Sequence, residues 1–215
     1  MNEEENLNKK QCKVSKDLIK SISYDQQEII NNILKLYNKG QPIHFDPCYN
    51  VGGFYKNGVV LDPVLKSDIN PQLESVLKLD VRDLPFDASS IKSIIFDPPF
   101  IVSGNSKCKM AQRYGSFSSL EELKTFYKDS LISLQRVLKH GGLLIFKFQD
   151  FIIGRKQHLI LPYIYSVARE LNFAVRDLFI LLAKNRIGYQ QNQNHARKYH
   201  CYFLVLKCNK RQDKK

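Results

Sequence analysis

The sequence lacks the features that mark membrane-spanning and disulfide-rich proteins. No apolar run approaches the roughly 20 residues that a spanning helix requires, and the polar, charged first ten residues give no indication of a signal peptide. The five cysteines are widely spaced and contain no Cys-x-x-Cys pair, which argues against a disulfide framework and against a zinc ribbon. These absences favour a cytoplasmic protein whose thiols are reduced.

Acidic residues are almost missing from the end of the chain. Residues 184–215 contain nine Lys or Arg but only one acid, Asp213. A polyanion is the natural partner of such a segment. For residues 210–215 a solvated tail is the simpler interpretation, because blocks of like charge are usually disordered.

The chain has no internal repeat and no linker-like segment, so its 215 residues predict one domain. We expect a disordered leader over 1–15, the domain over 16–209 and the basic tail over 210–215. Within the domain, Asp25 is predicted to cap a helix that ends at Gly40. Its apolar side would consist of Ile29, Ile30, Ile33, Leu34 and Leu36.

Four short apolar runs finish on an aspartate: "PIHFD" at Asp46, "VLKSD" at Asp68, "VLKLD" at Asp80 and "IIFD" at Asp97. Open α/β sheets bind their ligands at the carboxyl ends of parallel strands. The pattern therefore predicts a Rossmann-like α/β sheet with a row of carboxylates along one edge. The alternative is that each Asp merely starts a turn.

The second half of the chain predicts the rest of that sheet. A capping box at Ser119 and Glu122 begins a helix that runs to Gly141 and Gly142. The later elements are a strand over 143–148, a helix over 157–171, and strands over 173–183 and 199–207. Because only a loop joins the last two strands, they should pair antiparallel. We expect a mostly parallel sheet with an antiparallel C-terminal hairpin and helices on both faces.

Two successive prolines end the strand that precedes Asp97, since proline cannot donate to a sheet ladder. The tetrapeptide Asp97-Pro98-Pro99-Phe100 resembles the (Asp/Asn/Ser)-Pro-Pro-(Tyr/Phe/Trp) catalytic motif of class I S-adenosylmethionine-dependent methyltransferases that modify exocyclic amino groups of nucleic-acid bases. "RVLKHGGLLIFKFQD" (136–150) and "LDVRDLPFD" (79–87) resemble the fifth strand and the third-strand loop of the same fold. More narrowly, "DPCYNVGGFYK", "FKFQD" and "HARKYHCYF" resemble compact bacterial and phage-type DNA methyltransferases.

The resemblance implies a role for each residue of the motif. The Asp97 side chain and the Pro98 carbonyl would accept the two N–H bonds of the target amino group, and Pro98 and Pro99 would fix the turn that presents them. Phe100 would stack on the target base; its alternative is a place in the core.

The resemblance also implies S-adenosyl-L-methionine as cofactor. Asp68 would bind the ribose hydroxyls, and Asp80 with the backbone of Val81 would bind the adenine. Near the methionine moiety the candidates are Asp46, Pro47 and Gly52, whose alternative is a role as turn residues. The family's Gly-x-Gly turn and helix are missing after the first strand, so an irregular loop is expected there. The histidines are scattered and predict no metal site.

Nucleic-acid contacts are expected from two loops, with solvated loop tips as the alternative. The candidates share positive charge or side-chain amides, which bind phosphates and base edges: Lys107, Lys109, Arg113, Gln193, Asn194, His195, Arg197 and Lys198. The favoured reaction is methylation of adenine N6 in DNA, with cytosine N4 as the near alternative, in the cytoplasm or associated with the nucleoid. RNA methylation, methylation of a protein glutamine, and an inactive nucleic-acid-binding subunit of a methyltransferase complex stay open, as does a protein partner that supplies specificity.

Overall fold

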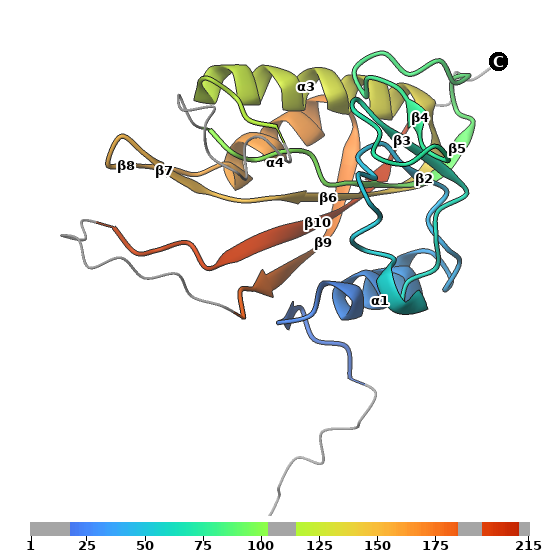
Figure 1. The fold of residues 1–215 in the computed structure, drawn as a ribbon, viewed down its shortest axis with the longest axis horizontal. Coiled ribbons are helices and arrows are strands. Elements are labelled where there is room, and N and C mark those ends of the chain that lie inside the picture. The colour runs from blue at the N-terminus through green and yellow to red at the C-terminus, as the bar shows by residue number, and fades with distance from the viewer. Residues whose placement is uncertain (1–17, 103–114, 185–194, 211–215) are drawn as a thin grey trace, which may run out of the picture.

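The computed structural model describes residues 18–102, 115–184 and 195–210. Within these residues one mixed sheet has the strand order β1-β9-β10-β6-β5-β2-β3-β4 (Figure 1). Its strands are β1 (Ile22–Ser23), β2 (Phe45–Asp46), β3 (Leu65–Asp68), β4 (Leu77–Lys78), β5 (Ile91–Phe96), β6 (Leu138–Phe148), β9 (Phe173–Leu182) and β10 (His200–Cys208). A separate hairpin joins β7 (Phe151–Ile153) to β8 (Lys156–His158).

The topology confirms the predicted sheet. Strands β4, β3, β2, β5 and β6 pair parallel to one another, whereas β10 lies antiparallel between β6 and β9. The predicted C-terminal antiparallel pair is therefore present. A feature that the sequence did not predict is β1, which pairs parallel with β9 at the far end of the sheet.

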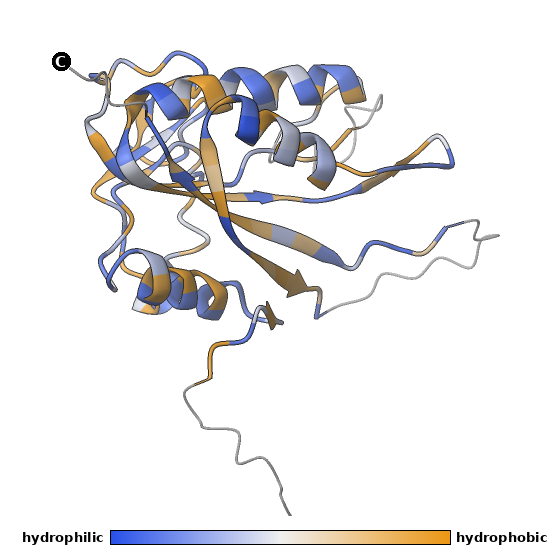
Figure 2. Cartoon of the chain, turned by 180° about the vertical axis from the view of Figure 1, so that it is seen from behind, coloured by the Kyte–Doolittle hydropathy of each residue, from blue (hydrophilic) through white to orange (hydrophobic). Residues whose placement is uncertain are grey.

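Helices cover both faces of the sheet: α3 (Leu120–Val137) and α4 (Leu161–Glu170) lie on one face, and α1 (Gln26–Tyr37) lies on the other (Figure 1). Successive strand residues alternate between two cores, as the two-residue period of a strand requires. Phe96 and Phe146 belong to the core under α3 and α4, while Ile95 and Ile145 belong to the core with α1. Figure 2 shows the apolar strands between these layers.

The two predicted helix starts are correct, and two details of these helices differ. Asp25 caps α1 by accepting from the backbone N–H of Gln27, but Leu36 is 50% exposed rather than part of the apolar side. Ser119 caps α3, which ends at Val137 instead of continuing to Gly141. The helix stops early because Leu138 already pairs with Ile91 as the first residue of β6.

The predicted helix over 157–171 is wrong at its start, where the chain instead forms the β7–β8 hairpin and then α4. Gly154 and Arg155 both have positive φ, as the tight turn of a hairpin requires. Asp150 is 5% exposed, and its Oδ1 accepts from the Ile160 backbone N–H (2.7 Å) at the start of α4. Nine residues lie between these partners in the sequence, so this contact closes the base of the hairpin.

The ends of the predicted domain are described only in part. The leader over 1–15 lies outside the described residues, as do residues 211–215 of the predicted tail. Lys210, the first residue of that tail, donates from Nζ to the Arg136 carbonyl (2.8 Å) and to the Ser89 hydroxyl (2.6 Å). Among the described helices, none has the length and hydropathy to cross a bilayer.

Candidate active site

The sheet brings the four predicted aspartates to one edge. Asp46 and Asp68 are the last residues of β2 and β3, Asp97 directly follows β5, and Asp80 comes two residues after β4. These strands are parallel, so their carboxyl ends share an edge. All four carboxylates raise the pKa of the Cys48 thiol, after a larger effect from its burial. The four aspartates that the sequence predicted at strand ends therefore share this edge of the sheet, near Cys48.

Asp46 is the buried member of this cluster, with 1% of its surface exposed. Its Oδ2 accepts from the Tyr55 hydroxyl (2.8 Å), and its Oδ1 accepts from the Cys48 backbone N–H (2.9 Å). The pKa of Asp46 is raised to about 7, mainly by burial and to a smaller extent by the charges of Asp97 and Asp68, against the lowering effect of the two hydrogen bonds. Asp46 thus joins the end of β2 to the loop that follows it, through Cys48 and Tyr55.

Asp97 is in an ion pair that the sequence analysis missed. Its Oδ2 lies 2.9 Å from Nζ of Lys147, on the neighbouring strand β6. The Lys147 side chain is 11% exposed, and its ammonium lies 5.0 Å from the ring centre of Phe54 and 5.6 Å from that of Phe203. A lysine inside the otherwise apolar run "LLIFKF" was the available signal, because a buried charge requires a partner.

The turn after Asp97 is held from two sides. Pro98 is buried, and the Tyr127 hydroxyl from α3 lies 3.4 Å from the Pro99 carbonyl oxygen. A side chain on Gly115 would contact the Pro99 ring, since an added Cβ would lie 3.4 Å from its Cγ. Phe100 is only partly buried. The backbone at the motif is thus fixed while Asp97 and Phe100 keep exposed surface.

The connection from β2 to β3 is the irregular loop that the sequence predicts, with one short 3₁₀ turn, η2 (Lys56–Gly58). Tyr49 and Tyr55 stack within it at 5.4 Å between ring centres. Gly52 has a φ of +70°, and a Cβ there would lie 2.6 Å from the Tyr49 hydroxyl oxygen, so only glycine fits. On the α1 side, the Gln27 amide donates to the carbonyls of Phe54 and Lys56.

Asp68 and Asp80, the candidates for the ribose and the adenine, differ in what they already bind. Each Asp68 oxygen accepts one backbone N–H at 2.9 Å, from Asn50 and from Asn70. Asp80 is bound through both oxygens by the guanidinium of Arg82, which lowers the pKa of Asp80. Val81 is buried in the core, and Pro47 is buried beside Asp46.

Five of the predicted nucleic-acid contacts lie outside the described residues: Lys107, Lys109, Arg113, Gln193 and Asn194. The other three are placed beside the β7–β8 hairpin. Nε2 of His195 lies 2.7 Å from the Arg155 carbonyl oxygen at the hairpin tip. Arg197 is exposed, and the carbonyl of Lys198 accepts from the Gln149 amide (3.2 Å).

Two hollows lie around the β2–β3 loop. One, of about 450 Å³, is lined by the start of α1, by Gly53 and Lys56, and by the end of β9. The other, of about 420 Å³, is lined by Tyr49, Gly52 and Tyr55. Neither includes Asp97, whose side chain is 22% exposed at the end of β5. In the described part of the chain, no group of three or more His, Cys, Asp or Glu could hold a metal ion.

The same fold occurs in several solved structures. TrmN from Thermus thermophilus matches with a TM-score of 0.51 and 17% identity, over 86% of this chain and 50% of TrmN. The CurJ carbon methyltransferase matches with a TM-score of 0.50 and 12% identity, over 86% of this chain and 53% of CurJ. An inferred DNA modification methylase, also from Thermus thermophilus and in complex with S-adenosyl-L-methionine, matches with a TM-score of 0.45 and 17% identity, over 63% of this chain and 56% of the methylase.

These matches identify the sheet as the Rossmann-like methyltransferase fold. This chain spans about half the length of the solved structures just described. No protein-family model matches the chain, and no curated protein matches it. A fold hosts many functions, so the activity has to be argued from the site.

Proposed function

We propose that this protein is an S-adenosylmethionine-dependent methyltransferase that acts on an exocyclic amino group of a nucleic-acid base, most specifically adenine N6 in DNA. The observation that carries the proposal is the position of Asp97 and its two prolines. They follow β5 directly, in a cluster with the carboxylates of the neighbouring strand ends, on a methyltransferase fold.

The acidic edge fits a cationic cofactor. The cofactor supplies an electrophilic methyl group on a positively charged sulfur. Asp68 has one acceptor bond made on each oxygen and retains lone pairs for two ribose hydroxyls. Asp80, with the backbone of Val81, would bind the adenine. This requires the Arg82 guanidinium to give up part or all of its contact with the Asp80 carboxylate. Gly52 and the buried Asp46 and Pro47 would shape the loop beside the methionine moiety.

Asp97 would do the chemistry on the acceptor. The lone pair of an exocyclic amino nitrogen is delocalised into the ring, so the nitrogen is a poor nucleophile until its N–H bonds are drawn toward acceptors. Asp97 and the Pro98 carbonyl would accept those two N–H bonds and stabilise the positive charge that develops on nitrogen. Lys147 donates to Oδ2 of Asp97, which would leave Oδ1 for the amino group of the substrate. Phe100, partly exposed, would stack on the base.

Cytosine N4 is the near alternative, because its amino group requires the same two acceptors. RNA as substrate, and an inactive binding subunit that acts through a protein partner, are distinguished by the same experiment. Methylation of a protein glutamine is less consistent with this chain. Enzymes of that kind favour Asn at the position of Asp97, and their reaction does not explain the cationic surface at Arg197 and Lys198.

The test is transfer of labelled methyl from S-adenosylmethionine to double-stranded DNA, single-stranded DNA and RNA in parallel, with nucleoside mass spectrometry of the products. We expect N6-methyldeoxyadenosine as the product, and we expect Asp97→Ala to lower the rate of its formation by roughly a thousandfold. The matched control is Asp87→Ala, an exposed aspartate outside the cluster. Cofactor binding without transfer to any substrate would reject the reaction. Absence of cofactor binding as well would leave the inactive-subunit alternative.

A further inference from the structure

The β7–β8 hairpin and the segment 195–198 lie against each other at the end of β6. His195 contacts the hairpin at its tip, through the Arg155 carbonyl oxygen, and Gln149 contacts the Lys198 carbonyl at its base. Figure 1 shows the hairpin projecting beyond the sheet, with the chain that leads into β10 running beside it. We call these two segments, residues 151–158 and 195–198, the cationic arm.

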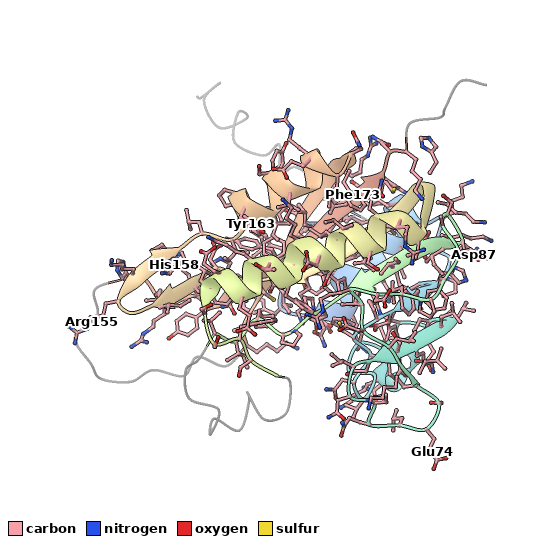
Figure 3. All side chains as sticks on the ribbon, turned by 90° about the horizontal axis from the view of Figure 1, so that it is seen from above. Glu74, Asp87, Arg155, His158, Tyr163 and Phe173 are labelled. Atoms are coloured by element: carbon pink, nitrogen blue, oxygen red, sulfur yellow. The ribbon has the colours of Figure 1, made fainter. Side chains whose placement is uncertain are left out.

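The arm carries positive charge without acids. Its Lys and Arg residues are Arg155, Lys156, Arg197 and Lys198, and neither segment contains Asp or Glu. The first three are exposed. Figure 3 shows Arg155 at the extreme end of the molecule, far from Glu74 and Asp87 at the opposite end. Cations that are not neutralised by neighbouring acids are available to a polyanion.

The base of the arm is rigid and adjoins the proposed site. Asp150 accepts from the Ile160 backbone N–H (2.7 Å) and from the Tyr202 hydroxyl (2.9 Å), which fixes the hairpin to α4 and to β10. The rings of Tyr202 and Phe148 contact each other at 5.5 Å between centres. Phe148 is the residue after Lys147, the partner of Asp97, so the arm begins at the edge of the cluster.

We infer that the cationic arm binds the phosphate backbone of duplex DNA and holds the target strand at Asp97. The inference rests on the proposed function and adds the β7–β8 hairpin to the nucleic-acid contacts already predicted at Arg197 and Lys198. The shape favours DNA over RNA. A two-stranded ribbon fits the major groove of B-DNA, where its cations lie between the two rows of phosphates, whereas the major groove of A-form RNA is too narrow and deep to admit it.

The experiment measures binding of a labelled DNA duplex of about 30 base pairs, without cofactor, across a range of salt concentrations. Arg155→Gln/Lys156→Gln should lower affinity roughly tenfold and reduce the slope of log K against log salt by about 2, since each phosphate contact contributes about one unit. Arg197→Gln/Lys198→Gln should do the same. The matched control is Lys35→Gln/Lys39→Gln, which neutralises two exposed lysines at the far end of α1.

Equal affinity and slope in the hairpin variant and the α1 control would overturn the inference. A loss confined to an RNA duplex of equal length would overturn the assignment to DNA. Methyl transfer is measured separately on the same variants. Arm-dependent binding without methyl transfer would reject the proposed function and keep the arm, whereas transfer to DNA by variants that bind as the control does would reject the arm and keep the function.

Discussion

Residues 41–90 carry seven Asp or Glu and four Lys or Arg, whereas residues 151–208 carry nine Lys or Arg and two acids. The acidic region forms strands of two to four residues joined by loops, and the cationic region contains strands of nine and ten residues. Glu74 and Asp87 mark one end of the molecule and Arg155 the other (Figure 3).

The two regions are also stabilised differently. In the acidic region, side chains bind the backbone of the β2–β3 loop: Asp46 and Asp68 from the region itself, and Gln27 from α1. In the cationic region, β9 and β10 form a long antiparallel ladder with one register shift between Val205 and Leu206. Groups that hold the acidic region together also line the proposed cofactor site, so changes there should affect stability and function together. The ion pair of Asp97 with Lys147 belongs to neither region; its residues come from the ends of β5 and β6, the strands that lie between the two regions in the sheet.

The largest expected effect is on stability in the acidic region. The raised pKa of Asp46 means that the folded protein keeps a proton that the unfolded chain has lost between about pH 4 and about pH 7. The free energy of unfolding should therefore fall by about 4 kcal/mol as pH rises through this window. Asp46→Asn, which has the same size and no charge, should remove this part of the dependence. Urea unfolding at several pH values gives the free energy of unfolding of the two proteins as a function of pH. If the two proteins show the same dependence on pH, the prediction is wrong.

Breaking the ion pair between Asp97 and Lys147 should lower the rate of methyl transfer. Lys147→Met removes the cation 2.9 Å from Asp97 and should lower kcat by roughly 10- to 100-fold. Lys147→Arg should retain more activity because it keeps the charge.

The matched control for that change is Lys66→Met. Lys66 is paired with Asp62 and lies 4.8 Å from the Tyr49 ring centre, so it resembles Lys147 without touching Asp97. Stopped-flow or quench measurements of kcat, with calorimetry for cofactor affinity, separate the effects. An unchanged kcat with weaker cofactor binding would show that Lys147 acts on the cofactor instead.

The glycine pair in the β2–β3 loop tests how tightly that loop is built. Gly52→Ala should cost about 1–3 kcal/mol, because of the positive φ and the 2.6 Å approach to Tyr49. Gly53→Ala should be close to neutral, since nothing lies within 4 Å of a Cβ there. Thermal unfolding of both variants provides the comparison, and equal losses would mean that the loop adapts.

The smallest effect is expected at Asp68. Asp68→Asn keeps one acceptor oxygen and replaces the other with an amide, so one of the N–H bonds from Asn50 and Asn70 loses its acceptor. We expect about a tenfold loss of cofactor affinity and little change in kcat at saturating cofactor. Asp62→Asn, in the same region but paired with Lys66, is the control for a general loss of negative charge.

The sequence predicted the elements whose signals are local. Strands that end on Asp, the cap at Asp25 and the stop at Pro98 and Pro99 follow from residue periodicity and backbone chemistry. The β7–β8 hairpin was missed because two strands of three residues are too short to show alternation, and residues 157–171 contain enough apolar side chains for a longer helix.

The site was predictable to the same extent. The row of four carboxylates follows from parallel strands. The Lys147 ion pair and the burial of Asp46 depend on neighbours far apart in the chain, Phe54 and Phe203 for one and Tyr55 for the other. The sequence likewise could not predict that the segment 195–198 lies against the β7–β8 hairpin, because the hairpin itself was not predicted.

Because of Asp150, the geometry of the sheet does not depend on the length of the hairpin. It joins the end of β6 to the first backbone N–H groups of α4, so the nine residues between Asp150 and Ile160 leave and return at the same point. An excursion closed in this way is modular: its loop can be shortened, extended or exchanged for another sequence while Asp97 and Lys147 keep their positions. Exchanging this segment between proteins of the same fold should therefore change the affinity for DNA without changing the geometry at Asp97.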